Sequence, residues 1–311
     1  MKIDPLFFLV ILCGYSTLFG QVALDTVIAQ KGDGIFSILR KSGIHPVEYY
    51  VDFLELNKDA IKGASELVVG REYILPHAPD SFKNMGTFIN VDENEQLPLF
   101  DADLVNMKRR DSTLNNTVYH LIYHTAETEG KNNNVLDAFI LTLSKDLMER
   151  GARVYVLQKN DMPLPNGTID KDNENAIADF GELTSIVNKN YLKNNGSYQR
   201  VLMIRDSKLN KKGMSITMCH YEKSTEGQRL ARSFREIFKK NALGEVKTGQ
   251  GISPFTDKSN MYLSKNMLPS LTIIDVNGED KGIRVRSEKS SLAQLITKGI
   301  VYDHANTDSA E

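Results

Sequence analysis

The chain has 311 residues, which is enough for two ordered domains because domain cores usually take about 100–200 residues each. Hydrophobic residues make up 41% of the chain, charged residues make up 25%, and the net charge is -2. These values are typical of a globular protein and exclude a wholly disordered or polytopic membrane protein. The basic residues come in short runs interleaved with acidic residues, so the charge pattern does not indicate a nucleic-acid partner.

Residues 1–21 have the features of a cleaved signal peptide. Residues 5–19 are almost uninterrupted apolar sequence, with Lys2 before them and Gly20 and Gln21 after them. This run of about fifteen residues is shorter than the roughly 20 residues that a permanent transmembrane helix needs. We therefore expect cleavage near residue 20 or 21, export to the periplasm or cell envelope, and no permanent membrane span.

The two cysteines have different expected fates. Cys13 lies inside the apolar run, which leaves lipidation as an alternative to simple cleavage, although Leu12 occupies a position where lipoprotein signals carry a small residue. After cleavage Cys219 is the remaining cysteine, so no internal disulfide can form. The alternation of residues 216–221 predicts a strand in which Cys219 packs as a small apolar side chain.

Residues 26–76 fall into four pieces with consistent local signals. An alternating strand at residues 26–30 leads into a turn in which Asp33 can cap the next helix. That helix starts at Ile35 and is ended by Gly43, and a second helix runs from Pro46 to Asn57. A final strand at residues 71–75 is stopped by Pro76. The predicted order is βααβ.

Three phrases of this segment resemble the LysM family. They are Gly32-Asp33-Gly34-Ile35-Phe36-Ser37-Ile38, then Leu56-Asn57, and finally Val69-Gly70-Arg71-Glu72-Tyr73-Ile74-Leu75-Pro76. Gly34 departs from the threonine that is usual in the first phrase. The resemblance implies a module that binds N-acetylglucosamine-containing glycan, as in peptidoglycan, in a shallow groove. The implied groove residues are Gly32, Asp33, Gly34, Ile35, Asn57 and Ile61. The alternative is a βααβ module that serves protein contact alone.

The rest of the chain predicts a linker and one larger domain. Residues 77–116 are rich in Asp, Asn and Pro and are expected to form a linker that lies on the next domain. Residues 117–304 alternate strands with helices, which predicts an α/β domain with a mostly parallel sheet covered on both faces. Expected strands are 118–123, 153–157, 200–204, 214–221 and 271–276, expected helices are 135–150, 183–191, 225–240 and 290–302, and residues 305–311 are a tail.

Four phrases in this order resemble the zinc-dependent N-acetylmuramoyl-L-alanine amidases over about residues 118–302. They are Leu147-Met148-Glu149-Arg150-Gly151-Ala152-Arg153-Val154-Tyr155, Tyr198-Gln199-Arg200-Val201-Leu202-Met203-Ile204, Glu226-Gly227-Gln228-Arg229-Leu230-Ala231, and Leu268-Pro269-Ser270-Leu271-Thr272-Ile273-Ile274-Asp275. The resemblance implies a parallel α/β sandwich that acts on peptidoglycan. A zinc site in that family takes two His and one Glu, with a further Glu as general base, because three protein ligands leave one position for an activated water.

The corresponding positions of this chain are degenerate. His124 stands where the first histidine is expected, but residues 132–134, where the glutamate should lie, are three asparagines, and neutral amides are poor zinc ligands. The place of the second histidine reads Arg205-Asp206-Ser207, and a guanidinium there would repel a cation. Asp275 replaces the catalytic glutamate. His120 cannot join His124 on one metal, because four residues of strand span about 13 Å.

Three functions therefore stay open. The first is a peptidoglycan-binding protein with an inactive amidase-like domain, which acts as a wall scaffold or regulates other wall hydrolases and needs no cofactor. The alternative is an active amidase in which His124, Glu127 or Glu129, and Asp206 bind zinc or another divalent metal and Asp275 is catalytic. Oxygen-rich ligation of that kind suits Mn²⁺, Mg²⁺ or Ca²⁺ better than zinc. An adaptor without glycan affinity is a third reading.

Overall fold

The computed structural model describes residues 25–61, 63, 66–124, 134–159, 174–206, 214–240, 258–276, 283–285 and 292–307. The chain divides into two compact units, the first made of Met1–Leu39 with Pro46–Ala78 and the second of Arg40–His45 with Pro79–Glu311. The expected signal peptide, with Cys13, lies outside the described residues. Within the described ranges, no helix has both the length and the apolar character needed to span a membrane.

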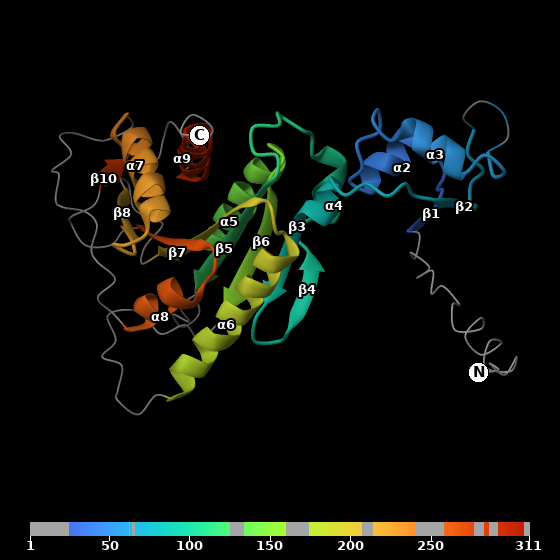
Figure 1. Ribbon diagram of the computed structural model, residues 1–311. Helices are drawn as coiled ribbons and strands as arrows, with labels where there is room; N and C mark the ends of the chain where they lie inside the picture. The colour runs from blue at the N-terminus through green and yellow to red at the C-terminus, as the bar shows by residue number, and fades with distance from the viewer. Residues whose placement is uncertain are drawn as a thin grey trace, which may run out of the picture. The chain divides into compact units, whose positions relative to one another are not determined.

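The first unit has the predicted βααβ order (Figure 1). Its elements are β1 (Thr26–Ile28), α2 (Ile35–Lys41), α3 (Tyr50–Leu56) and β2 (Glu72–Ile74). The two strands pair antiparallel, with Val27 opposite Tyr73. Gly43 follows α2 with a φ of 72°, the left-handed conformation that glycine adopts after a helix end. The second helix begins at Tyr50 and not at Pro46, because residues 46–48 form a turn.

The core of the first unit is small and is completed by one buried amide. The side chains of Ile38, Leu39, Phe53 and Tyr73 are fully buried. The Asn57 amide nitrogen donates to the carbonyls of Phe53 and Ile74, both at 2.8 Å, and its oxygen accepts from the backbone N–H of Ile74 at 2.7 Å. Asn57 therefore joins the end of α3 to β2 and satisfies backbone groups that the short elements leave unpaired.

The second unit is an α/β structure. It contains α4 (Phe82–Met85), β3 (Gly86–Asn90), β4 (Glu95–Pro98), the 3₁₀ helix η1 (Ala102–Asn106), β5 (Thr117–His124), α5 (Asn134–Met148), β6 (Arg153–Lys159), α6 (Glu174–Lys193), β7 (Tyr198–Asp206), β8 (Met214–His220), α7 (Thr225–Lys240), α8 (Lys258–Asn266), β9 (Ser270–Val276), β10 (Ile283–Val285) and α9 (Leu292–Ala305). The described strands form one sheet in the order β10-β8-β9-β7-β5-β6-β3-β4. Strands β9, β7, β5, β6 and β3 run parallel, and β8, β10 and β4 extend the sheet through antiparallel pairs. The predicted mostly parallel α/β sheet is confirmed.

Residues 77–116 are more than the linker that the sequence predicted. Strand β3 pairs parallel with β6, and β4 pairs antiparallel with β3. Phe82, Met85 and Leu104 are buried in the same core as α5. Asp and Asn residues are spread through this segment, and the apolar run Phe88–Ile89 that enters the sheet is too short to indicate a strand by itself.

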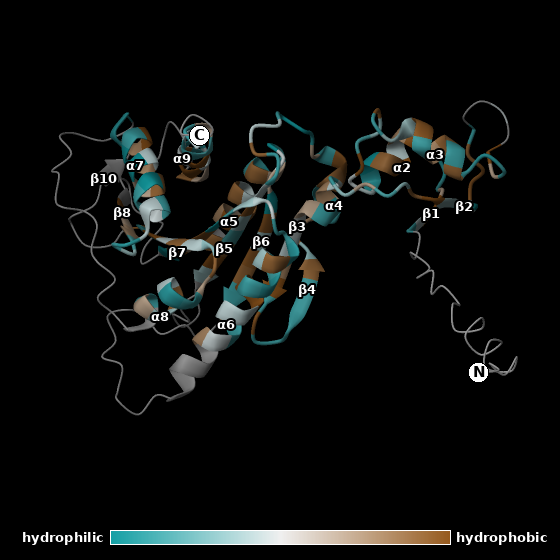
Figure 2. Cartoon of the chain, in the orientation of Figure 1, coloured by the Kyte–Doolittle hydropathy of each residue, from teal (hydrophilic) through white to brown (hydrophobic). Residues whose placement is uncertain are grey.

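Helices cover the sheet on both faces, so the unit has three layers (Figure 1). Side chains of α5, α7 and α9 pack with Tyr119, Leu121, Val156 and Leu202 of the strands in one core. Side chains of α6 and α8 pack with the alternate strand residues on the other face, among them Ile122, Leu157, Met203 and Ile273. Figure 2 shows the corresponding hydropathy, with β6 and α5 largely hydrophobic and α7 mixed between hydrophilic and hydrophobic residues. Apolar residues on both faces are the expected pattern for central parallel strands.

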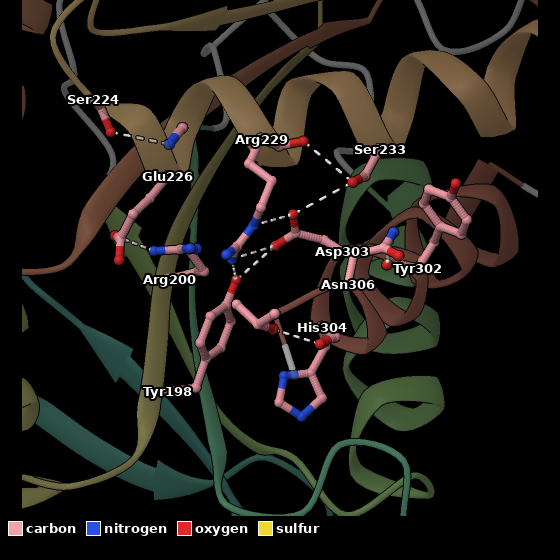
Figure 3. A network of polar contacts seen from close by, with 12 residues as sticks. Tyr198, Arg200, Ser224, Glu226, Arg229, Ser233, Tyr302, Asp303, His304 and Asn306 are labelled. Atoms are coloured by element: carbon pink, nitrogen blue, oxygen red, sulfur yellow. Dashed lines mark hydrogen bonds and ion pairs between the residues drawn. The ribbon is translucent and has the colours of Figure 1, made fainter. Parts of the chain in front are cut away.

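A buried carboxylate holds α9 to α7 and β7 (Figure 3). Asp303 is buried and accepts hydrogen bonds from the Tyr198 hydroxyl at 2.6 Å and from Nε of Arg229 at 2.9 Å. Arg229 also donates to the Tyr198 oxygen at 2.8 Å, and Ser233 donates to Asp303 at 3.3 Å. Burial raises the pKa of Tyr198, so the phenol stays neutral and donates. The charge of Asp303 is thus paired and hydrogen-bonded, as burial requires.

We expect Gly299→Ala to destabilise the second unit, because a Cβ on Gly299 would lie 2.0 Å from Cδ1 of the buried Phe234 ring. Overpacking of this kind costs about 1–3 kcal/mol. Urea unfolding followed by circular dichroism measures the change. The matched control is Gly181→Ala in α6, where the nearest heavy atom, the Tyr262 hydroxyl oxygen, is 3.8 Å from the new Cβ. That variant should be neutral or gain up to about 1 kcal/mol from helix propensity. Equal effects at the two glycines would contradict the close packing of α7 and α9.

Candidate functional site

The carboxyl ends of the parallel strands form the edge where ligands usually bind in sheets of this kind. Along this edge the register aligns positions from four neighbouring strands. His124 of β5 pairs with Lys159 of β6, and Arg205 of β7 pairs with Asp275 of β9. Between β5 and β7, Tyr123 pairs with Ile204, and His124 and Arg205 are the next residues of the two strands. One row of the sheet therefore reads Lys159, His124, Arg205, Asp275.

Strand alternation places the four positions on the same face of the sheet. Leu157, Ile122, Met203 and Ile273 each precede one of them by two residues, and all four belong to the core under α6 and α8. Residues two apart on a strand face the same way. The row thus lies at the end of the α6 and α8 side of the sheet. The backbone of His124 is described, whereas its side chain lies outside the described part of the structure.

Two ion pairs occupy this row. Arg205 donates from Nε to one oxygen of Asp275 at 2.5 Å and from Nη2 to the other at 2.8 Å, a two-pronged arrangement. Lys159 donates from Nζ to Asp92 at 2.7 Å. In both pairs the cation is more buried than its partner, with side-chain exposures of 16% against 25% and 4% against 32%. At this edge the basic groups are therefore more buried, and the carboxylates are closer to solvent.

The predicted catalytic and metal-binding residues have different outcomes. Asp275 is at the predicted edge, but both of its oxygens are bound by Arg205. Asp206 ends β7 and His124 ends β5, and the side chains of both lie outside the described residues. Glu127 and Glu129 also lie outside them. Asp275 lies near the carboxyl end of β9, and the sequence did not indicate its pairing with the guanidinium of Arg205.

The described donors at this edge do not fit a zinc ion. Among the side chains that the structure describes, no group of three or more His, Cys, Asp or Glu residues could hold a metal. A metal bound to Asp275 would have to share that carboxylate with a guanidinium within 3 Å, and two cations at such distances repel each other. A second cation, Lys159, is paired in register with the position of His124. The edge as described suits ion pairs better than a divalent cation.

Two residues of this edge, Lys159 and Asp92, were missed by the sequence analysis. A signal for Lys159 existed, because it directly follows the apolar run of β6, and a lysine at the carboxyl end of a buried strand is a candidate site residue. Asp92 could not have been found in that way. It lies just after β3, in the segment that was predicted to be a linker.

The predicted glycan groove of the first unit is only partly exposed. Gly32 and Gly34 are exposed, and a Cβ at either would meet no atom within 4 Å. Asp33 is half-buried and accepts hydrogen bonds from the N–H of Gln30 and the hydroxyl of Ser37, both at 2.9 Å, so it closes the turn before α2.

Ile35 and Asn57, two of the residues that the resemblance places in the groove, contribute little exposed surface. Both side chains are buried, and the amide of Asn57 is used inside the fold. Ile61 remains half-buried at the end of the loop after α3. Beside this turn the Phe36 ring is exposed and lies 5.4 Å from the ring of Tyr50. The exposed groups near the turn are therefore Gly32, Gly34 and this aromatic pair.

His120 is a core residue and takes no part in the edge. Its side chain is fully buried, stacks on Tyr155 with ring centroids 5.3 Å apart, and lies 3.4 Å from the amide oxygen of Gln199. Burial lowers the pKa of His120 to about 4, so the ring is neutral at physiological pH. Cys219 is likewise buried in the core under α6 and α8.

Comparison with known proteins gives structural similarity alone. No family model matches the sequence. No curated protein matches it either. Among solved structures, the N-acetylmuramyl-L-alanine amidase Ami1 from Mycobacterium smegmatis is 10% identical with a TM-score of 0.37, over 64% of this chain and 99% of that one. The catalytic domain of the CD27L endolysin targeting Clostridia difficile is 15% identical with a TM-score of 0.36, over 59% and 96%. The amidase AmiC2 of Nostoc punctiforme is 15% identical with a TM-score of 0.28, over 62% and 97%. TM-scores of this size do not establish a function.

We expect the free energy of unfolding to fall between pH 6.5 and pH 4 because of His120. Above pH 6.5 the ring is neutral in both states, and below that value the unfolded chain binds a proton that the folded chain, with a pKa of about 4, does not. The loss is about 1.4 kcal/mol per pH unit and up to about 3 kcal/mol in total. Urea unfolding of the native chain and of His120→Gln across this range tests it. The variant should show a shallower pH dependence, and an unchanged slope would contradict the assignment.

Proposed function

We propose that this chain is an exported peptidoglycan-binding protein in which the second unit has an amidase-like fold without hydrolytic activity. The first unit supplies affinity for N-acetylglucosamine-containing glycan. The second unit serves as a scaffold in the cell wall or as a regulator of active wall hydrolases. This proposal combines the resemblance of the sequence phrases to the two families with the geometry of the carboxyl edge.

The observation that carries the proposal is the pair between Arg205 and Asp275. Asp275 stands where the resemblance places the general base of the hydrolases, and Arg205 stands where it places a zinc ligand. A general base must accept a proton from water, and a ligand position must supply a lone pair to the metal. Here the first group is bound through both oxygens, and the second is a guanidinium without a lone pair to give. Both positions therefore argue against hydrolysis, because neither Asp275 nor Arg205 is available to activate water.

Features of the first unit support glycan binding. The turn at Gly32 to Gly34 is open, with no atom in the way of a ligand at either glycine. Backbone groups of such a turn can bind the acetamido group of a sugar by hydrogen bonds, and the adjacent exposed ring of Phe36 offers an apolar contact for a pyranose face. The exposed backbone and aromatic ring suit a neutral sugar polymer, which is bound by hydrogen bonds and ring contacts.

We predict that the purified full chain, dialysed against trace zinc, contains far less than one zinc per chain and releases no stem peptide from peptidoglycan sacculi. Metal content is measured by inductively coupled plasma mass spectrometry, and release is measured by chromatography of the soluble products. The active amidase is the alternative outcome. Stoichiometric metal that is lost in His124→Ala, together with peptide release that is lost in the same variant, would establish it and overturn the inactive assignment.

We also predict that the full chain cosediments with sacculi and that Gly34→Glu weakens this binding several-fold. The substitution adds a charged side chain at the open turn without a clash inside the unit. Val51→Glu introduces the same charge on the exposed face of α3 and should leave binding unchanged. Sedimentation of a concentration series measures the affinity. Equal losses in the two variants would show that charge and not the turn is responsible, and no cosedimentation of the native chain would favour an adaptor without glycan affinity.

A further inference from the structure

The guanidinium of Arg200 is buried near the start of β7 and is only partly satisfied. Its side chain is 2% exposed, and Nη1 is bound by the carboxylate of Glu226 in the first turn of α7. The guanidinium carbon lies 4.4 Å from the centre of the Tyr198 ring. In the described part of the chain, Nε and Nη2 have no hydrogen-bond partner. Figure 3 shows the guanidinium beneath the beginning of α7, between Glu226 and Tyr198.

The two unsatisfied nitrogens form the edge of the guanidinium that binds planar oxyanions. The N–H groups on Nε and Nη2 point the same way and match two oxygens of a carboxylate or phosphate. Two other arginines of this chain use that edge for a carboxylate. Arg205 binds Asp275 through it, and Arg229 binds Asp303 through it at 2.9 and 3.3 Å. In Arg200 the same edge is buried without an acceptor among the described residues, which is unfavourable for a polar group and more so for a charged one.

Neighbouring polar atoms on the same sheet face are also unsatisfied. Thr272 lies two residues beyond Ser270, the residue that pairs with Arg200, and it is paired in register with His220 of β8. Thr272 and His220 are buried, and Oγ1 of the first and Nε2 of the second have no partner among the described residues. The first turn of α7 lies close to His220, because a Cβ at Gly227 would lie 2.9 Å from Cβ of His220. Buried polar atoms that lack protein partners are usually bound to an ordered ligand or to water.

We propose that Arg200 binds a small oxyanion, a carboxylate or phosphate, through Nε and Nη2 under the amino end of α7. The site lies at the amino ends of β7 and β9, at the opposite end of the strands from the row that contains Asp275. Oγ1 of Thr272 and Nε2 of His220, which have no partner among the described residues, lie on the same face of the sheet, on the next two strands. Glu226 is the competing acceptor, and because its side chain is 56% exposed it can turn toward solvent.

Calorimetric titration of the full chain with phosphate and, separately, with acetate, in a chloride buffer of matched ionic strength, tests this site. We expect saturable binding of one anion per chain. Arg200→Lys keeps the charge and removes the two-pronged edge, so it should weaken binding by about tenfold or more. Glu226→Gln removes the competing charge and should tighten binding. Arg232→Lys, on the exposed face of α7, is the matched control and should bind as the native chain does.

The outcomes are distinguishable. Saturable binding of phosphate alone identifies phosphate, and binding of acetate identifies a carboxylate ligand. If the native chain binds neither anion, the edge is satisfied by water and the proposal is wrong. If Arg200→Lys binds as the native chain does, the anion is bound elsewhere and the proposal is also wrong. Should Arg200→Lys fail to fold, Glu226→Gln decides the matter, because an unchanged or weaker affinity in that variant contradicts competition at Arg200.

Discussion

The register of the parallel strands is the constraint on which the rest of the second unit depends. Because β6, β5, β7 and β9 are neighbours and run in the same direction, equivalent positions on each strand end at the same edge. A slip of one residue in any strand would move each of its side chains to the opposite face, so the packing of both cores would be lost and the polar residues at the strand ends would no longer meet. The apolar side chains of both cores thus fix which polar residues meet at each end of the sheet.

At the carboxyl end this constraint brings acidic and basic residues together as ion pairs. Arg205 pairs with Asp275, and Lys159 pairs with Asp92, which lies in the turn after β3. Partly buried charges are tolerated there because each has a partner at hydrogen-bond distance, and removal of one partner would leave the other desolvated and unpaired. The same pairing opposes the roles that a hydrolytic centre would need from these positions.

At the amino end the pairing is incomplete. Asp303 is fully satisfied by Tyr198, Arg229 and Ser233. In contrast Arg200, which is two residues after Tyr198 and on the same face of β7, has two nitrogens without a partner among the described residues. The guanidinium of Arg229 has a carboxylate partner for both Nε and Nη2, whereas that of Arg200 does not, so this region of the fold can satisfy one arginine and leaves the other incomplete. The two ends of the sheet thus differ, because the ion pair of Arg205 at the carboxyl end uses the Nε and Nη2 edge of the guanidinium, whereas at the amino end Arg200 is paired through Nη1 alone among the described residues.

The sequence by itself determined the βααβ order of the first unit, most strands and helices of the second, and the parallel sheet, because apolar periodicity and turn residues are local signals. It could not assign β3 and β4 to the sheet, because their short apolar runs are surrounded by polar residues, and β3 joins the sheet only by pairing with β6 while β4 pairs with β3. Nor could it show that Asn57 is an internal hydrogen-bonding group, that Arg205 binds Asp275, or that Arg200 is buried. Those features depend on which distant backbone and side chains are brought within about 3 Å, and only the tertiary structure decides that.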